Sequence, residues 1–174
     1  MKKIILASAI SMAMFSGATM AAQNGQVTFL GAVTQTTCDL KPSVNGSDKN
    51  QVDLGTVNIG ATATQPTPFS LVKDGSSACA GLTQGKTATI AWMGNLNDKG
   101  VVNESTGANA ATGAWVKLTP VNANTNNDIK QGQDSVVFDA TKLGTEGFKF
   151  NATLTGDNTP GEFRSVVSYA VAYN

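Results

Sequence analysis

Few side chains in this sequence have types and spacings that could do chemistry. The chain contains no histidine, two cysteines and two tryptophans, and only 14% of its residues are charged. Catalysis needs a nucleophile with a base, paired carboxylates or metal ligands, and no zinc-protease, nucleophile-elbow or phosphate-loop motif occurs. Carboxylates such as Asp134 and Asp139 lie near lysines, as is usual for a solvated surface. We therefore predict a protein that is not an enzyme, with no catalytic residue, metal or cofactor.

The first 22 residues have the pattern of a secretory signal peptide. Lys2 and Lys3 precede an apolar run that ends in small residues at Ala21 and Ala22. The run is too short and too interrupted for a stable membrane span. Cleavage near Ala22 leaves an exported chain of about 150 residues, which is the size of one domain. Its net charge of about −2 gives no sign of nucleic-acid binding.

The cysteines, Cys38 and Cys79, are about forty residues apart. Export to an oxidising compartment favours their pairing, and the spacing does not resemble a redox C-x-x-C motif. A loop of this length predicts a structural disulfide that stabilises the fold by about 4 kcal/mol in the chain-entropy model.

The elements that must position these residues are best seen at the end of the sequence, in Gly161–Asn174. From Val167 to Tyr173 large apolar residues occupy every second position, with small residues between them. A period of two predicts a strand, and we expect both of its faces to be buried. Nothing in this sequence follows Asn174 to pair with its second edge, so we expect the missing neighbour to come from elsewhere.

A second alternating row lies close to the start of the mature chain. Val27, Phe29, Gly31 and Val33 share one face of an extended segment. Glycine in a row of bulky residues usually marks a bulge or the close approach of another backbone. An ordinary first strand of a sandwich is the alternative interpretation.

Short strand-like patterns separated by turn signals fill the rest of the chain. They occupy residues 38–44, 51–60 with a bend at Gly55, the region of Phe69 and Leu71, 86–94, 114–120, 136–138 and 147–156. Polar loops are expected at 95–113 and 122–133, and no stretch has a sustained helical period. The N-x-S/T sequences at Asn45, Asn103 and Asn151 are interpreted as turn and strand residues. This pattern predicts an all-β sandwich.

The two ends together resemble the subunits of chaperone–usher fimbriae, the type 1 pilin-like family of Gram-negative bacteria. The resemblance rests on the V-x-F-x-G-x-V row, the cysteine spacing and the D-L-G sequence at Asp53–Gly55. It also rests on the penultimate Tyr173 and on Gly161, fourteenth from the end. The short W-x-G and G-A-W-V-K-L matches look most like a major subunit.

The resemblance implies an incomplete immunoglobulin-like β-sandwich that a donated strand completes. Residues 23–36 would be an N-terminal donor arm and residues 37–174 the sandwich domain. The implied donor residues are Val27, Phe29, Gly31 and Val33, and the implied groove and chaperone-recognition residues are Gly161, Val167, Tyr169, Val171, Tyr173 and Asn174. The implied partners are further copies of the chain, a periplasmic immunoglobulin-like chaperone and an outer-membrane usher. The product would be a fimbrium on the cell surface.

A host-glycan-binding function within the same domain is the alternative. Aromatic faces stack on sugars, so Trp92 and Trp115 with the Asn/Gly-rich loops would form a shallow sugar site. The competing interpretation is that both tryptophans lie in strands and fill the core.

Overall fold

The computed structural model describes residues 38–75, 79 and 81–174. The predicted signal peptide (1–22) and donor arm (23–36) lie outside the described residues. In the described part, regular structure consists of strands and the single-turn helix α1 (Lys142–Thr145), and no helix is long and apolar enough to cross a membrane. The predicted all-β class is confirmed.

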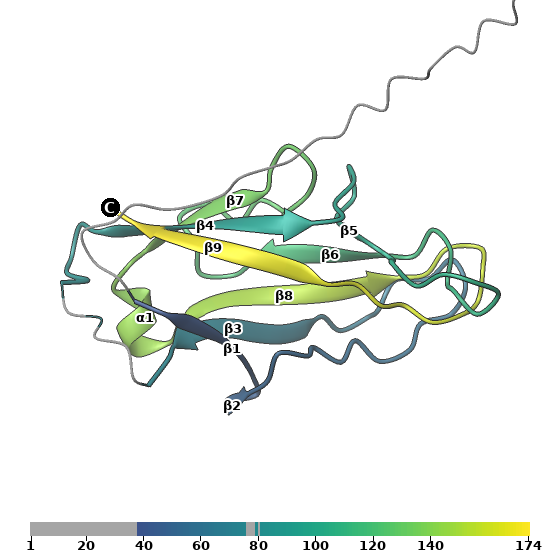
Figure 1. The fold of residues 1–174 in the computed structure, drawn as a ribbon, viewed down its shortest axis with the longest axis horizontal. Coiled ribbons are helices and arrows are strands. Elements are labelled where there is room, and N and C mark those ends of the chain that lie inside the picture. The colour runs from purple at the N-terminus through teal and green to yellow at the C-terminus, as the bar shows by residue number, and fades with distance from the viewer. Residues whose placement is uncertain (1–37, 76–78, 80) are drawn as a thin grey trace, which may run out of the picture.

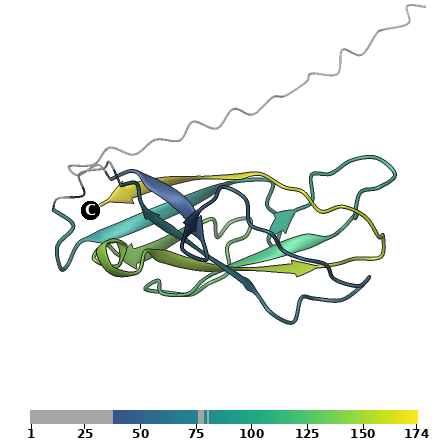
Figure 2. The ribbon, with the colours of Figure 1, turned by 90° about the horizontal axis from the view of Figure 1, so that it is seen from below.

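Two antiparallel sheets form the sandwich (Figures 1 and 2). The larger sheet has the order β2-β1-β3-β8-β6-β5, with β1 at Leu40–Val44, β2 at Ser47–Asp48, β3 at Thr67–Lys73, β5 at Val101–Val102, β6 at Trp115–Pro120 and β8 at Phe148–Thr155. The smaller sheet has the order β7-β4-β9, with β4 at Thr87–Gly94, β7 at Ser135–Asp139 and β9 at Val167–Tyr173. β9, the predicted last strand, therefore lies at a sheet edge.

Alternating burial explains why these stretches form strands. In β8 every second residue from Phe148 is buried, and β4 and β6 show the same period of two. The inward residues meet in an aromatic cluster. The Trp92 ring stands edge-on to the Phe150 ring at a centroid distance of 5.1 Å, and Phe69 stacks on Phe150 at 5.4 Å. These rings join the two sheets into one core.

The segment 51–60 differs from the prediction, since the structure has no sheet strand there. The side chains do alternate, with Val52 and Leu54 turned towards the core and Val57 following after a change of phase. The change occurs at Gly55, which has φ +67° and donates its N–H to the Asp53 carboxylate. The segment is thus extended without forming a sheet strand.

The two tryptophans have different surroundings. Trp92 is 4% exposed and lies in the core, as one of the two interpretations predicted. Trp115 lies on the outer face of β6, because the inward positions of that strand are Val116, Leu118 and Pro120. The prediction that both tryptophans fill the core is therefore wrong for Trp115. A shared sugar site is also wrong, since the Trp92 ring is covered.

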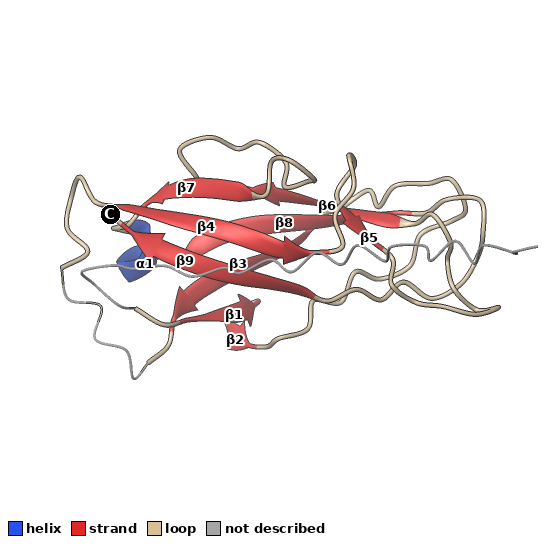
Figure 3. Cartoon of the chain, turned by 45° about the horizontal axis from the view of Figure 1, so that its top comes forward, coloured by secondary structure: helices blue, strands red, loops and turns tan. Residues whose placement is uncertain are grey.

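The sandwich is elongated and its two ends differ (Figures 1 and 3). The C-terminus and α1 lie at one end, which we call the α1 end. Long loops gather at the other, the loop end, where the segment before β9 meets residues of the 103–111 loop.

A groove beside the last strand

The outer edge of β9 has free main-chain groups. Among the described residues its only strand neighbour is β4. Thr87 and Asn174 exchange both main-chain hydrogen bonds, each 2.9 Å long. In an antiparallel pair such residues alternate with residues whose N–H and C=O point away from the partner. By this parity the outward main-chain groups belong to Val167, Tyr169, Val171 and Tyr173, the residues that the resemblance assigned to the groove.

The side chains of these four residues point towards the core, and three of them are incompletely covered. Val167, Tyr169 and Val171 are half-buried against the core cluster, whereas Tyr173 is 7% exposed. On the opposite face Ser168 is exposed. The expectation that both faces of this strand are buried is thus wrong for the described chain, in which β4 is the only strand beside β9.

A groove of about 970 Å³ opens at the loop end of this edge, and Val167 is the one residue of β9 that lines it. Core side chains form its floor, among them Phe69, Trp92 and Leu118. One bank is the segment 161–167 that leads into β9, and the other is the extended segment 50–59. Both banks have the alternation of strands, and neither is part of a sheet along the groove. Such a groove fits one further strand, which buries alternate side chains and bonds to the bank.

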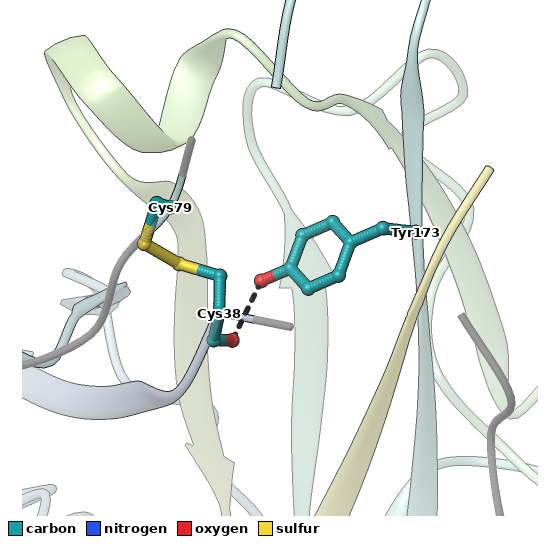
Figure 4. Close-up of a disulfide and its surroundings, with 3 residues drawn as sticks. All are labelled: Cys38, Cys79 and Tyr173. Carbon is teal, nitrogen blue, oxygen red and sulfur yellow. Dashed lines mark hydrogen bonds between the residues drawn. A yellow bond between two sulfur atoms is a disulfide. The ribbon is translucent and has the colours of Figure 1, made fainter. Parts of the chain in front are cut away.

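The tyrosines of β9 tie this strand to the first strand of the other sheet. The Tyr169 hydroxyl donates to the Leu40 carbonyl at 2.9 Å, and the Tyr173 hydroxyl donates to the Cys38 carbonyl at 3.0 Å. Cys38 also forms the disulfide with Cys79, as predicted (Figure 4). The α1 end of β9 is therefore fixed by two hydrogen bonds, one of them to a residue that the disulfide anchors.

The Tyr173 hydroxyl should make stability depend on alkaline pH. Burial, with smaller contributions from Asp39 and Tyr169, raises the pKa of Tyr173 to about 12, whereas an unfolded tyrosine titrates near 10. Because the pKa is higher in the folded state, this contribution is complete below about pH 10 and is lost as pH rises towards 12. Tyr173→Phe is expected to lower the free energy of unfolding by about 1 kcal/mol at pH 8 and to flatten its decline above pH 10.

Urea unfolding between pH 8 and 11 measures both effects. Tyr169→Phe is the comparison variant, because it also removes a hydroxyl that donates to a main-chain carbonyl and whose pKa is raised by burial. An unchanged alkaline decline in Tyr173→Phe would assign the effect to other groups.

Gly161 lies where two loop backbones touch. A Cβ at this position would stand 2.3 Å from the Asn109 carbonyl oxygen. The next residue, Glu162, accepts a hydrogen bond from the Ala111 N–H at 3.0 Å and forms a parallel bridge with Ala110. Glycine is thus needed for close packing at the start of the groove bank, and Gly161 also lines the groove.

Two polar atoms at the groove lack partners among the described residues. They are the Trp92 Nε1–H and the Ser165 hydroxyl, both buried, in residues that line the groove. Buried polar groups normally form hydrogen bonds, so these two atoms are exceptions in this core. Asn174 is exposed at the α1 end. The predicted donor residues Val27, Phe29, Gly31 and Val33 lie outside the described residues.

Comparison with curated proteins identifies relatives over nearly the whole chain. The F107 fimbrial protein of Escherichia coli is 40% identical over 175 residues, covering 99% of both chains. The chain belongs to the fimbrial proteins. The F17 and K99 fimbrial proteins of Escherichia coli are 30% and 27% identical, also covering 99% of both chains. Among solved structures, the crystal structure of the P pilus rod subunit PapA has 18% identity and a TM-score of 0.47, covering 87% of this chain and 100% of that chain. No protein-family model matches the chain.

Membership of the fimbrial proteins confirms the resemblance to chaperone–usher fimbrial subunits. The protein is exported through the periplasm and is a structural subunit of a surface fimbrium. It is not an enzyme. Its partners include further copies of itself. The described residues contain no group of histidines, cysteines or carboxylates that could hold a metal ion.

The predicted last strand begins at Val167, which is also the first residue of β9 in the structure. The alternation of burial extends further back along the chain, since Phe163 and Ser165 are half-buried between exposed neighbours. The letters F-R-S-V-V contain this signal, which a serine in an otherwise apolar row obscures. The other bank, the segment 50–59, overlaps the stretch 51–60 for which the sequence predicts a strand with a bend at Gly55.

Proposed function

We propose that this fimbrial subunit polymerises by donor-strand complementation, in which residues 23–36 of one copy occupy the groove of the next. The observation that supports this most directly is the outer edge of β9, where free main-chain groups stand beside an open apolar floor. Together these two features provide what a β-strand needs to bind.

The proposed donor arm matches the groove in chemistry. Val27, Phe29 and Val33 share one face and would cover floor residues such as Phe69 and Leu118. Burial of each such side chain contributes about 1.5–3 kcal/mol before the cost of ordering the arm. Gly31 would lie where the floor comes closest to the donated backbone.

The positions of the chain segments favour a head-to-tail polymer. Cys38, which follows the arm closely in sequence, is at the α1 end beside Tyr173. The groove opens at the loop end. Donor and acceptor surfaces therefore lie on different parts of the molecule, and repetition of such a contact builds an open filament.

Until the arm arrives, the groove needs another occupant. The exposed apolar side chains of Ile59 and Val166, 58% and 66% exposed, flank it. Exposed apolar surface of this kind promotes aggregation. In our proposal a periplasmic immunoglobulin-like chaperone lends a strand here, and its basic residues hold the carboxylate of Asn174. At the outer-membrane usher, the arm of the next subunit replaces this strand.

Substitution of Gly31 tests the donor role. Gly31→Leu is expected to block polymerisation, because the added side chain would collide with the groove floor. Ala32→Leu is the matched control, since this residue has the opposite parity and would face away from the floor. The yield of polymers that resist detergent without boiling measures assembly. Equal yields from both variants and the wild type would refute this placement of Gly31.

Host-glycan binding is a second candidate, which now rests on the outer-face Trp115 and the loops. Glycan arrays probed with assembled fimbriae test it. Loss of signal in Trp115→Ala, with assembly intact, would support a lectin role, and fimbriae without any glycan signal would favour a purely structural subunit.

A further inference from the structure

The segment Phe163–Val166 continues the geometry of β9 although it is not part of a sheet. Glu162, Arg164 and Val166 are exposed, whereas Phe163 and Ser165 are half-buried. This alternation has the same phase as that of Val167 and Tyr169 within the strand. The extended conformation therefore begins four residues before β9.

Two side chains take the place of a strand partner for this segment. The Asn103 carboxamide accepts from the Arg164 N–H at 2.9 Å and donates to the Glu162 carbonyl at 2.8 Å. The Glu104 carboxylate accepts from the Val166 N–H at 3.0 Å, and the Glu104 N–H donates to the Arg164 carbonyl at 2.7 Å. These bonds reach only the even-numbered residues, which is the pattern that a neighbouring strand would give.

The odd-numbered residues consequently present their main-chain groups on the other side. Among the described residues no main-chain hydrogen bond joins Phe163 or Ser165 to a neighbour. Both line the groove together with Val167. Within the described part of the chain the buried Ser165 hydroxyl also has no hydrogen-bond partner. This second, independent observation points to a hydrogen-bonding partner beside Ser165.

We infer that Asn103 and Glu104 are positioning residues, which hold Phe163–Val166 extended so that this segment continues the binding edge of β9. This inference rests on the proposed function and names the occupant as the arm of a second copy. The edge spans eleven positions, and an arm of fourteen residues, 23–36, is long enough to cover it.

Residue-resolved hydrogen exchange on polymers of the mature full-length chain tests this extended edge. In wild-type polymers the amides of Phe163 and Ser165 should be protected together with those of Val167–Tyr173. In Glu104→Ala these two amides should exchange about tenfold faster. Without the carboxylate that binds the Val166 N–H, the segment is held less firmly and its hydrogen bonds to the arm open more often. Glu104→Gln keeps an acceptor for the Val166 N–H and should restore protection. The exposed Glu162→Ala is the matched control on the same segment.

Each outcome bears on one claim. Protection of Val27–Val33 in polymers tests the proposed function, and its absence would refute donor-strand assembly itself. If that arm is protected while Phe163 and Ser165 exchange freely, the edge ends at β9 and our inference fails. If Glu104→Ala exchanges like wild type at both residues, the positioning role fails. The Phe150 amide in β8 should not change in any variant, which separates a local effect from general unfolding.

Discussion

Deletion of Gln23–Val33 should abolish fibre formation while leaving a subunit that the chaperone still binds. The deleted residues contain the whole alternating row from Val27 to Val33, and none of them belongs to the described sandwich. The acceptor groove is formed by later residues and is kept. A subunit without its arm can thus receive a strand but cannot donate one. Electron microscopy for surface fibres and co-purification with the periplasmic chaperone measure the two halves of the prediction.

A shorter deletion provides the matched control. Removal of Gln23–Gly25 leaves the alternating row intact and should allow assembly. Fibres of normal length from the Gln23–Val33 deletion would contradict the donor role. Loss of both fibres and the chaperone complex would show that these residues serve folding of the subunit, as expected for the alternative of an ordinary first strand.

The alternating pattern in the sequence reports burial more reliably than pairing. It predicted β4, β6, β8 and β9, in which side chains alternate between core and surface. The same pattern at Val52–Val57 led to a predicted strand that the single chain does not form. Burial depends on the segment's own residues, but pairing also needs a neighbour on the correct side. At this bank the described chain supplies none, which is why the prediction failed there.

The residues that shape the loop end were beyond the reach of local patterns. In the sequence, Asn103 is only part of an N-x-S sequence. In the structure its side-chain amide donates hydrogen bonds to the carbonyls of Ala111 and Glu162. The bonded residues are separated by 59 positions, and no local period encodes such a contact. Trp115 illustrates the same limit. Its strand was predicted correctly, but the face on which the ring lies depends on which side of the sheet meets the core.

Half-burial of β9 connects stability with assembly. In a closed sandwich Val167, Tyr169 and Val171 would be covered by a neighbouring strand, whereas here they are packed on one side only. In the proposed assembly each would be buried further by the donated strand, which would stabilise the joint. The α1 end of the same strand is already fixed through Tyr173 and Cys38. In the proposed function, the fixed α1 end of β9 would keep the groove in shape before a strand binds at its open part.

Replacement of both cysteines by serine is expected to lower the free energy of unfolding by about 4 kcal/mol, because the disulfide closes a loop of 41 residues. Urea unfolding of the subunit with and without the bond measures this loss. A loss below about 1 kcal/mol would mean that the unfolded chain is already constrained in this region.

The double variant should also reduce the effect of Tyr173→Phe. The Cys38 carbonyl that accepts the Tyr173 hydroxyl belongs to the residue that the disulfide anchors. Without the bond this carbonyl is held less firmly, so the hydroxyl contributes less to stability. The losses should then be non-additive, whereas independent sites add within about 0.5 kcal/mol. Strict additivity would show that the pairing of β1 with β3 alone holds Cys38 in place. Non-additive losses would show that the disulfide and the Tyr173 hydroxyl stabilise the same part of the fold, the α1 end of β9.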